Sequence, residues 1–107
     1  MKTEIKERWI QLLESGEYNM GRDNLYQIGN DSYCPLGVLV EVALDEGVEI
    51  EIGRDERGQA VIDGTPHYLG PTLMEWSGIS SEQAYEIARY NDSRSLKKAI
   101  NYIKEEL

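Results

Sequence analysis

One segment of the chain, residues 35–44, restricts the fold more than any other. Proline suits the first turn of a helix, where its missing N–H needs no partner. Almost every residue after Pro35 is apolar: Leu36, Val38, Leu39, Val40, Val42, Ala43 and Leu44. A helix that is apolar on nearly every side has to be buried. The segment therefore predicts a central helix that the rest of the chain surrounds.

Two amphipathic segments at the ends of the chain are predicted to pack on this centre. Apolar residues recur at helical spacing from about residue 2 to residue 15, with Thr3 as the expected N-cap and Gly16 as the expected stop. A last helix is predicted from residue 96 onward, because Leu96, Ala99, Ile100, Ile103 and Leu107 form one apolar stripe.

Two further helices are predicted between residues 71 and 90. Pro71 opens a short helix that runs to Trp76, and Gly78 ends it. Ser80 and Gln83 then have the spacing of a capping box, which begins a helix that reaches about Tyr90.

Strand signals occur in two places. Val48, Ile50 and Ile52 alternate with glutamates, which predicts a half-buried strand over residues 48–52 with a partner strand over 59–63. A second, smaller hairpin is expected between residues 25–28 and 32–33, across a Gly-Asn-Asp turn. The predicted fold is α+β, with four to five helices packed around a small antiparallel hairpin sheet in a single domain, residues 1–107.

The charge balance excludes several classes of function. Twenty acidic residues against eleven basic ones give a formal net charge of -9. This argues against direct nucleic-acid binding and against docking on anionic membranes, both of which need a basic face. No apolar run approaches the ~20 residues of a membrane span. The charged start is no signal peptide and the single cysteine has no disulfide partner, so we expect a cytoplasmic protein.

The charges are also unevenly placed along the chain. Acidic residues are concentrated between residues 41 and 63, and basic residues between 89 and 104. The acidic hairpin is either a solvated surface or a patch that faces a basic partner. The residues of this acidic patch are Glu49, Glu51, Asp55 and Glu56.

Cys34 is the first candidate for chemistry, because it directly precedes the central helix. A helix N-terminus can stabilise a thiolate. His67 is the only histidine that could act as a base, and Asn91 or Asp92 could orient it, in the chain order of papain-like hydrolases. The competing interpretation is that Cys34 is a small apolar core residue beside Gly37, which permits the close approach of another element. No metal-ligand spacing and no phosphate-binding glycine loop occurs, so neither a metal nor a cofactor is expected.

The aromatic residues have an unusual composition, with seven tyrosines, two tryptophans and no phenylalanine. Each ring therefore has a polar group, which suits positions that are wet on one side. Those at helical positions, namely Trp9, Trp76, Tyr85 and Tyr102, are expected in the core or at its edge. The candidate residues for binding a ligand or partner are Tyr18, Arg22, Tyr26, Tyr33, Tyr68, Trp76, Asn91, Asp92 and Arg94.

Four segments carry a resemblance to a known family: WIQLLESGEY at 9–18, YCPLGVL at 33–39, WSGIS at 76–80 and YNDS at 90–93. Together they resemble small proteins of tailed bacteriophages and prophages. The pattern of that family is a tryptophan helix ending Ser-Gly-x-Tyr, then Tyr-Cys-Cys-Leu-Gly-Val-Leu, and an Asn-Asp turn before the last helix. This sequence departs from the pattern at Pro35, where a second cysteine is usual.

The resemblance implies a phage origin and the cytoplasm of a bacterial host. We predict a non-enzymatic accessory protein that binds and neutralises a host factor, as counter-defence proteins do, with the acidic patch against a basic host protein. One alternative is sequestration of a small nucleotide signal by tyrosines and arginines, for which a homo-oligomer would provide a deeper pocket. The second alternative is a hydrolase that depends on Cys34 and His67.

Overall fold

The computed structural model describes residues 1–93 and 95–107, which contain five helices and two small sheets. This confirms the α+β fold class. In chain order, the helices are α1 (Thr3–Ser15), α2 (Pro35–Asp45), α3 (Pro71–Ser77), α4 (Ser81–Asp92) and α5 (Leu96–Glu106).

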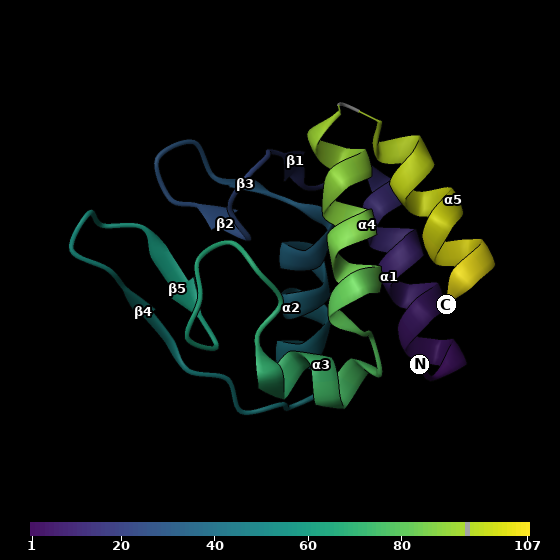
Figure 1. Ribbon diagram of the computed structural model, residues 1–107, viewed down its shortest axis with the longest axis horizontal. Coiled ribbons are helices and arrows are strands. Elements are labelled where there is room, and N and C mark those ends of the chain that lie inside the picture. Colours follow the sequence, from purple (N-terminus) through teal and green to yellow (C-terminus); the bar gives the residue numbers. More distant parts are fainter. Residues whose placement is uncertain (94) are drawn as a thin grey trace.

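Helix α2 is the centre of the molecule, as its composition predicts. Its residues from Pro35 to Val40 are all buried, and so are Val42 and Ala43. Helices α1 and α4 both pack against α2, and α5 packs on α1 and α4 (Figure 1). Trp9 from α1 is completely buried, and its indole Nε1 donates a hydrogen bond of 2.8 Å to the Pro35 carbonyl oxygen. Burial of this apolar surface is the main driving force for the fold.

The two sheets lie to one side of the helices (Figure 1). In the first, β3 (Ser32–Tyr33) pairs antiparallel with β2 (Tyr26–Gln27), which confirms the smaller predicted hairpin. The other edge of β3 pairs parallel with β1 (Asn19–Met20), a strand that the sequence did not indicate. The second sheet is the hairpin of β4 (Ile52–Arg54) and β5 (Ala60–Ile62).

The larger predicted hairpin is present, but its first strand begins later in the chain than the sequence predicts. Pairing begins at Ile52, where residues 48–52 were expected to be paired. Val48 and Ile50 alternate with exposed glutamates as the period of two predicts, but among the described residues no strand pairs with them. Ile52, expected to face the core, is exposed. Burial of alternate side chains can therefore produce a strand-like pattern without a hydrogen-bonded ladder.

Helix ends follow the predicted signals in most cases. Gly16 ends α1 in the left-handed conformation that glycine favours. Ser80 and Gln83 form the complete capping box at the start of α4. Thr3, predicted as the N-cap of α1, is instead its first helical residue after Lys2. Among the described residues, no helix has the length and apolar composition that a membrane span requires.

Asp63, one of the residues of the acidic segment, has a structural role that the sequence did not indicate. Its carboxylate oxygen Oδ2 accepts a hydrogen bond of 3.1 Å from the backbone N–H of Leu73 in the first turn of α3. That turn has unpaired N–H groups, so a nearby carboxylate stabilises it. The contact fixes the start of α3 relative to the end of β5.

Candidate functional site

An apolar groove of about 620 Å³ runs along α4, and we call it the α4 groove. Residues of α4, of the loop between β5 and α3 and of the start of α2 line it. Its floor consists of buried or part-buried apolar side chains from four different segments: Cys34, Leu36, Leu69, Met74, Ala84 and Ala88. Such a floor suits an apolar group supplied by a ligand or partner.

Two tyrosines flank the groove and are largely exposed. Tyr68 in the loop is 71% exposed, and Tyr85 on α4 is 65% exposed. The exposure of Tyr85 corrects the prediction that it lies in the core or at its edge. Large aromatic side chains left exposed beside a groove are typical of binding surfaces, because they can bury much area at little entropic cost.

Hydrogen bonds connect the separate segments that form the groove. Asn91 near the end of α4 donates from Nδ2 to the Gly21 carbonyl at 2.8 Å. Arg22 Nη1 donates to the main-chain carbonyl of Asp92 at 3.2 Å. The backbone N–H of Leu25 donates to the Pro66 carbonyl at 2.9 Å. The groove is thus held in shape by the fold itself, which lowers the entropic penalty of binding.

Asp23 lies between two of these contacts, in an unusual backbone conformation. Its φ of 74° is in the left-handed region, and a hydrogen bond of 2.9 Å from the Asn24 N–H to the Arg22 carbonyl closes a γ-turn around it. The Asp23 carbonyl lies 2.9 Å from Nδ1 of His67. Because a carbonyl only accepts, Nδ1 carries a proton in this contact.

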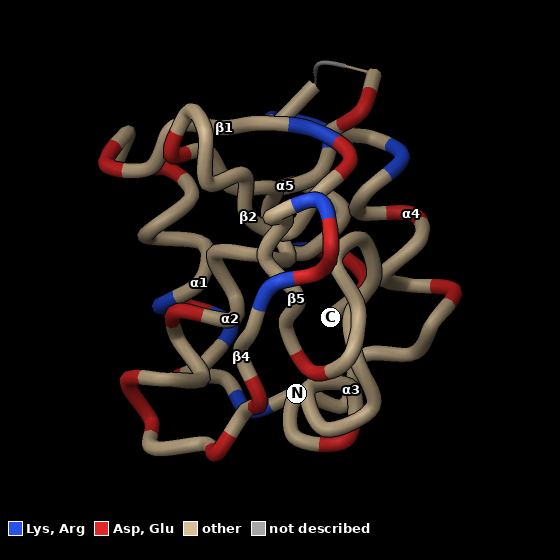
Figure 2. Tube along the Cα trace, turned by 90° about the vertical axis from the view of Figure 1, so that its left-hand side faces the viewer, with Lys and Arg blue, Asp and Glu red and all other residues tan. Residues whose placement is uncertain are grey.

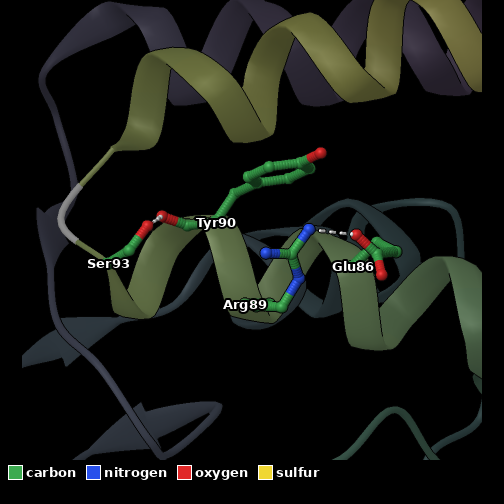
Figure 3. Close-up of polar contacts among 4 residues, drawn as sticks. All are labelled: Glu86, Arg89, Tyr90 and Ser93. Atoms are coloured by element: carbon green, nitrogen blue, oxygen red, sulfur yellow. Dashed lines mark hydrogen bonds and ion pairs between the residues drawn. The ribbon is translucent and has the colours of Figure 1, made fainter.

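The charged residues of the groove are predominantly acidic, because its arginine is already paired with a glutamate. Asp23, Asp92, His67 and Arg89 all line it. Arg89 is already paired: its Nη2 lies 2.7 Å from Glu86 Oε2, and its guanidinium carbon lies 4.7 Å from the centre of the Tyr90 ring (Figure 3). Among the residues that the structure describes, the carboxylates of Asp23 and Asp92 take part in no hydrogen bond or ion pair.

Cys34 belongs to the floor of the groove, in surroundings that oppose ionisation of its thiol. The residue is buried, and burial raises the pKa of its thiol to about 11. Backbone N–H groups in the first turn of α2 lower the pKa, but burial outweighs them. His67 lines the same groove, whereas Asn91 is buried and hydrogen-bonded to Gly21. A thiol that stays protonated at neutral pH does not favour the hydrolase alternative.

The buried thiol leads to a prediction about alkaline stability. The pKa of Cys34 is about 11 in the folded chain and 9.0 for an ordinary thiol. Between these pH values the unfolded chain loses a proton that the folded chain keeps, so the free energy of unfolding decreases as pH rises. We expect a loss of about 2–3 kcal/mol, measured by urea unfolding at about pH 8 and about pH 11.

The matched variant for this measurement is Cys34→Ala, which retains Tyr33 and the other alkaline groups. Burial also raises the pKa of Tyr33, to about 12, so part of the alkaline destabilisation should persist in the variant. A variant with the same alkaline loss as the wild type would show that Cys34 is not its source.

The other predicted binding tyrosines form a separate cluster on the three-stranded sheet. The ring centres of Tyr18 and Tyr26 lie 4.9 and 4.7 Å from that of Tyr33. The Tyr26 hydroxyl donates to Asp31 at 2.7 Å. All three side chains are half-buried and pack against the core. The cluster therefore stabilises the sheet, and the structure does not bring it together with Tyr68.

The acidic patch is less uniform than the sequence suggests. Glu49 and Glu51 lie in the segment before β4, while Asp55 and Glu56 lie in the β4–β5 turn. Basic positions flank the acidic ones of that turn on both sides (Figure 2). Asp55 Oδ1 accepts backbone hydrogen bonds of 2.9 Å from Arg57 and Gln59, so this carboxylate shapes the turn.

The remaining predicted binding residues have mixed positions. Asp92 and Tyr68 line the α4 groove, and Arg22 contacts its edge through the Asp92 carbonyl. Trp76 is half-buried against the core. Arg94 lies outside the described residues. Among the described residues, no group of three or more His, Cys, Asp or Glu side chains could hold a metal ion.

The sequence matches a protein family over residues 1–105, nearly its whole length, and the family is described as a domain of unknown function (DUF8296). The chain belongs to this family. No curated protein and no solved structure matches it. The α4 groove therefore provides the evidence on how this DUF8296 chain could act.

Asp23 and Tyr85 are among the groove residues that sequence reasoning missed. The buried residues of α4 are Ala84, Ile87 and Asn91, a stripe that does not include Tyr85. The helical period of this DUF8296 chain was therefore sufficient to place Tyr85 at the surface. Asp23 had no such signal, because its position depends on contacts with residues far along the chain.

Proposed function

We propose that the protein is a non-catalytic phage accessory protein that captures and neutralises a host protein, with the α4 groove as its docking site. The observation that carries this proposal is the pair of exposed tyrosines, Tyr68 and Tyr85, beside an apolar floor. Aromatic side chains around a pocket that binding desolvates dominate many protein interfaces. The phage origin is supported by the motif resemblance alone.

The position of the groove supports a protein partner. Its walls come from a helix face and from a loop held by hydrogen bonds, so a partner meets a preformed surface. Each flanking tyrosine extends the contact area beyond the floor. A protein segment can occupy the floor and cover both rings at once.

Sequestration of a small nucleotide signal has weaker support. The groove volume of about 620 Å³ suits a small ligand. Phosphates, however, would meet the carboxylates of Asp23 and Asp92, while Arg89 is paired with Glu86. Like charges of this kind oppose binding.

The proposal is tested with the double variant Tyr68→Ala/Tyr85→Ala. The intact protein is immobilised, the partner is captured from a bacterial lysate and identified by mass spectrometry, and the purified partner is then titrated calorimetrically. We expect the double variant to bind it more weakly by about 2 kcal/mol, or roughly 30-fold in Kd. Both tyrosines are exposed, so thermal unfolding should be nearly unchanged.

Two control variants show where the partner binds. Leu44→Ala/Ile52→Ala removes the other two large exposed apolar side chains, and should leave Kd unchanged. Reversal of Glu49, Glu51, Asp55 and Glu56 to lysine tests the acidic patch. Loss of binding on that reversal, with no effect of the tyrosine variant, would place the docking site on the hairpin and contradict the proposal. A thermal shift with nucleotides that the tyrosine variant abolishes would favour the nucleotide alternative.

A further inference from the structure

We propose that the α4 groove recognises an arginine side chain on a basic segment of its partner, an inference that rests on the function proposed above. The first argument is charge. Asp23 and Asp92 line the groove, and their carboxylates have no partner among the described residues. His67 also lines the groove, with its Nδ1 proton directed to the Asp23 carbonyl.

Within the part of the chain that the structure describes, neither Arg22 nor Arg89 forms an ion pair with these carboxylates. Arg89 is paired with Glu86 and lies over the Tyr90 ring (Figure 3). Arg22 reaches Asp92, but its guanidinium contacts the main-chain carbonyl and not the carboxylate. A cationic group that enters the groove therefore meets two aspartates that neither arginine pairs with.

The aromatic and apolar parts of the groove select among cations. A guanidinium group is planar, stacks on aromatic rings and donates hydrogen bonds in a fixed fork, whereas an ammonium group is a compact, strongly hydrated charge. Tyr68 and Tyr85 provide exposed rings, and the apolar floor suits the methylene groups of a long side chain. The combination fits arginine better than lysine.

The chain already holds one of its own arginines by the same means. Arg89 combines a carboxylate at 2.7 Å with a tyrosine ring at 4.7 Å, both supplied by α4 (Figure 3). The groove offers tyrosines and carboxylates to an arginine from outside. The net charge of -9 would also steer a basic partner towards the protein.

The test uses short peptides and the intact, ¹⁵N-labelled protein. The probe is acetyl-Gly-Leu-Arg-Leu-Gly-amide, and the matched peptides replace arginine by citrulline, lysine or glutamate. Citrulline retains the shape of arginine but has no charge. We expect the arginine peptide to shift the amide resonances of Leu69, Ala84 and Ala88 in the groove, with an affinity about tenfold higher than the citrulline or lysine peptide.

The variant Asp23→Asn/Asp92→Asn should lower affinity for the arginine peptide about tenfold and leave that for the citrulline peptide unchanged. Asparagine tolerates positive φ as aspartate does, and the main-chain contact with His67 is retained, so the fold should persist. Glu51→Gln/Glu56→Gln removes the same charge from the hairpin and is expected to have little effect.

Several outcomes would overturn the inference. If the citrulline peptide binds as tightly as the arginine peptide, the groove does not recognise charge. If the lysine peptide binds as tightly as the arginine peptide, the groove does not recognise the guanidinium group. An equal loss in the hairpin variant would indicate general electrostatic attraction. If the tyrosine variant loses its partner but no arginine peptide binds, the proposed function stands and this inference is wrong. If the tyrosine variant retains its partner, the proposed function is wrong.

Discussion

Replacing Gly37 by alanine is expected to destabilise the protein by about 3 kcal/mol, at the upper end of the range for overpacked cores. Gly37 lies in the first turn of α2, where the backbone of Leu25 passes directly against it. A Cβ atom at this position would overlap the Leu25 carbonyl oxygen. That carbonyl accepts a hydrogen bond of 3.2 Å from the Cys34 N–H, and the Leu25 N–H donates to Pro66, so the segment has little freedom to move away.

The control for this measurement is Gly29→Ala. A Cβ atom at Gly29 would have no neighbour within 4 Å, and its backbone is not in the left-handed region. We expect its stability to be unchanged or to increase by up to about 1 kcal/mol, because alanine restricts the unfolded chain. Thermal and urea unfolding of both variants give the comparison. Equal stabilities of the two variants would show that the contact with Leu25 does not constrain Gly37.

Replacing Trp9 by alanine is expected to have a still larger effect, about 3–5 kcal/mol. The Trp9 side chain has no exposed surface, and it lies between α1 and the central helix. Its removal creates a cavity in the core and also deletes the hydrogen bond of 2.8 Å to the Pro35 carbonyl. At 5 kcal/mol the loss would match the whole stability of many domains of this size.

Two further variants separate the contributions of Trp9. Trp9→Phe keeps an aromatic ring but has no donor for the Pro35 carbonyl. We expect it to lower the free energy of unfolding less than Trp9→Ala does, and the lost hydrogen bond accounts for about 1 kcal/mol of that decrease. Trp76→Ala removes the other tryptophan, which is only half-buried, and should cost clearly less than Trp9→Ala. Similar losses for Trp9→Ala and Trp76→Ala would contradict the central position assigned to Trp9.

The parts of the fold that the sequence predicts are those that depend on local patterns. The apolar run after Pro35 is sufficient to place α2 at the centre, because a helix of that composition has no face to expose to water. The capping box at Ser80 is likewise complete within four residues. Even Gly37 could be interpreted in advance as a point of close approach, although not which element approaches it.

The parts that could not be predicted depend on contacts between distant segments. Strand β1 has two residues and pairs in parallel with β3, so it carries no periodicity of its own. The α4 groove is formed where the turn around Asp23, the loop around His67 and one face of α4 meet. The hydrogen bond between His67 and the Asp23 carbonyl joins residues 44 positions apart. No spacing rule within a single sequence reports such a contact.

The exposed position of the two flanking tyrosines has a consequence for how such a chain can evolve. Tyr68 is in a loop anchored by its buried neighbour Leu69, and Tyr85 lies outside the buried stripe of α4. Substitutions at either position leave the packing around α2 intact, so selection can change them without a penalty in folding. One scaffold can therefore acquire new side chains beside the α4 groove in single steps while its interior remains the same.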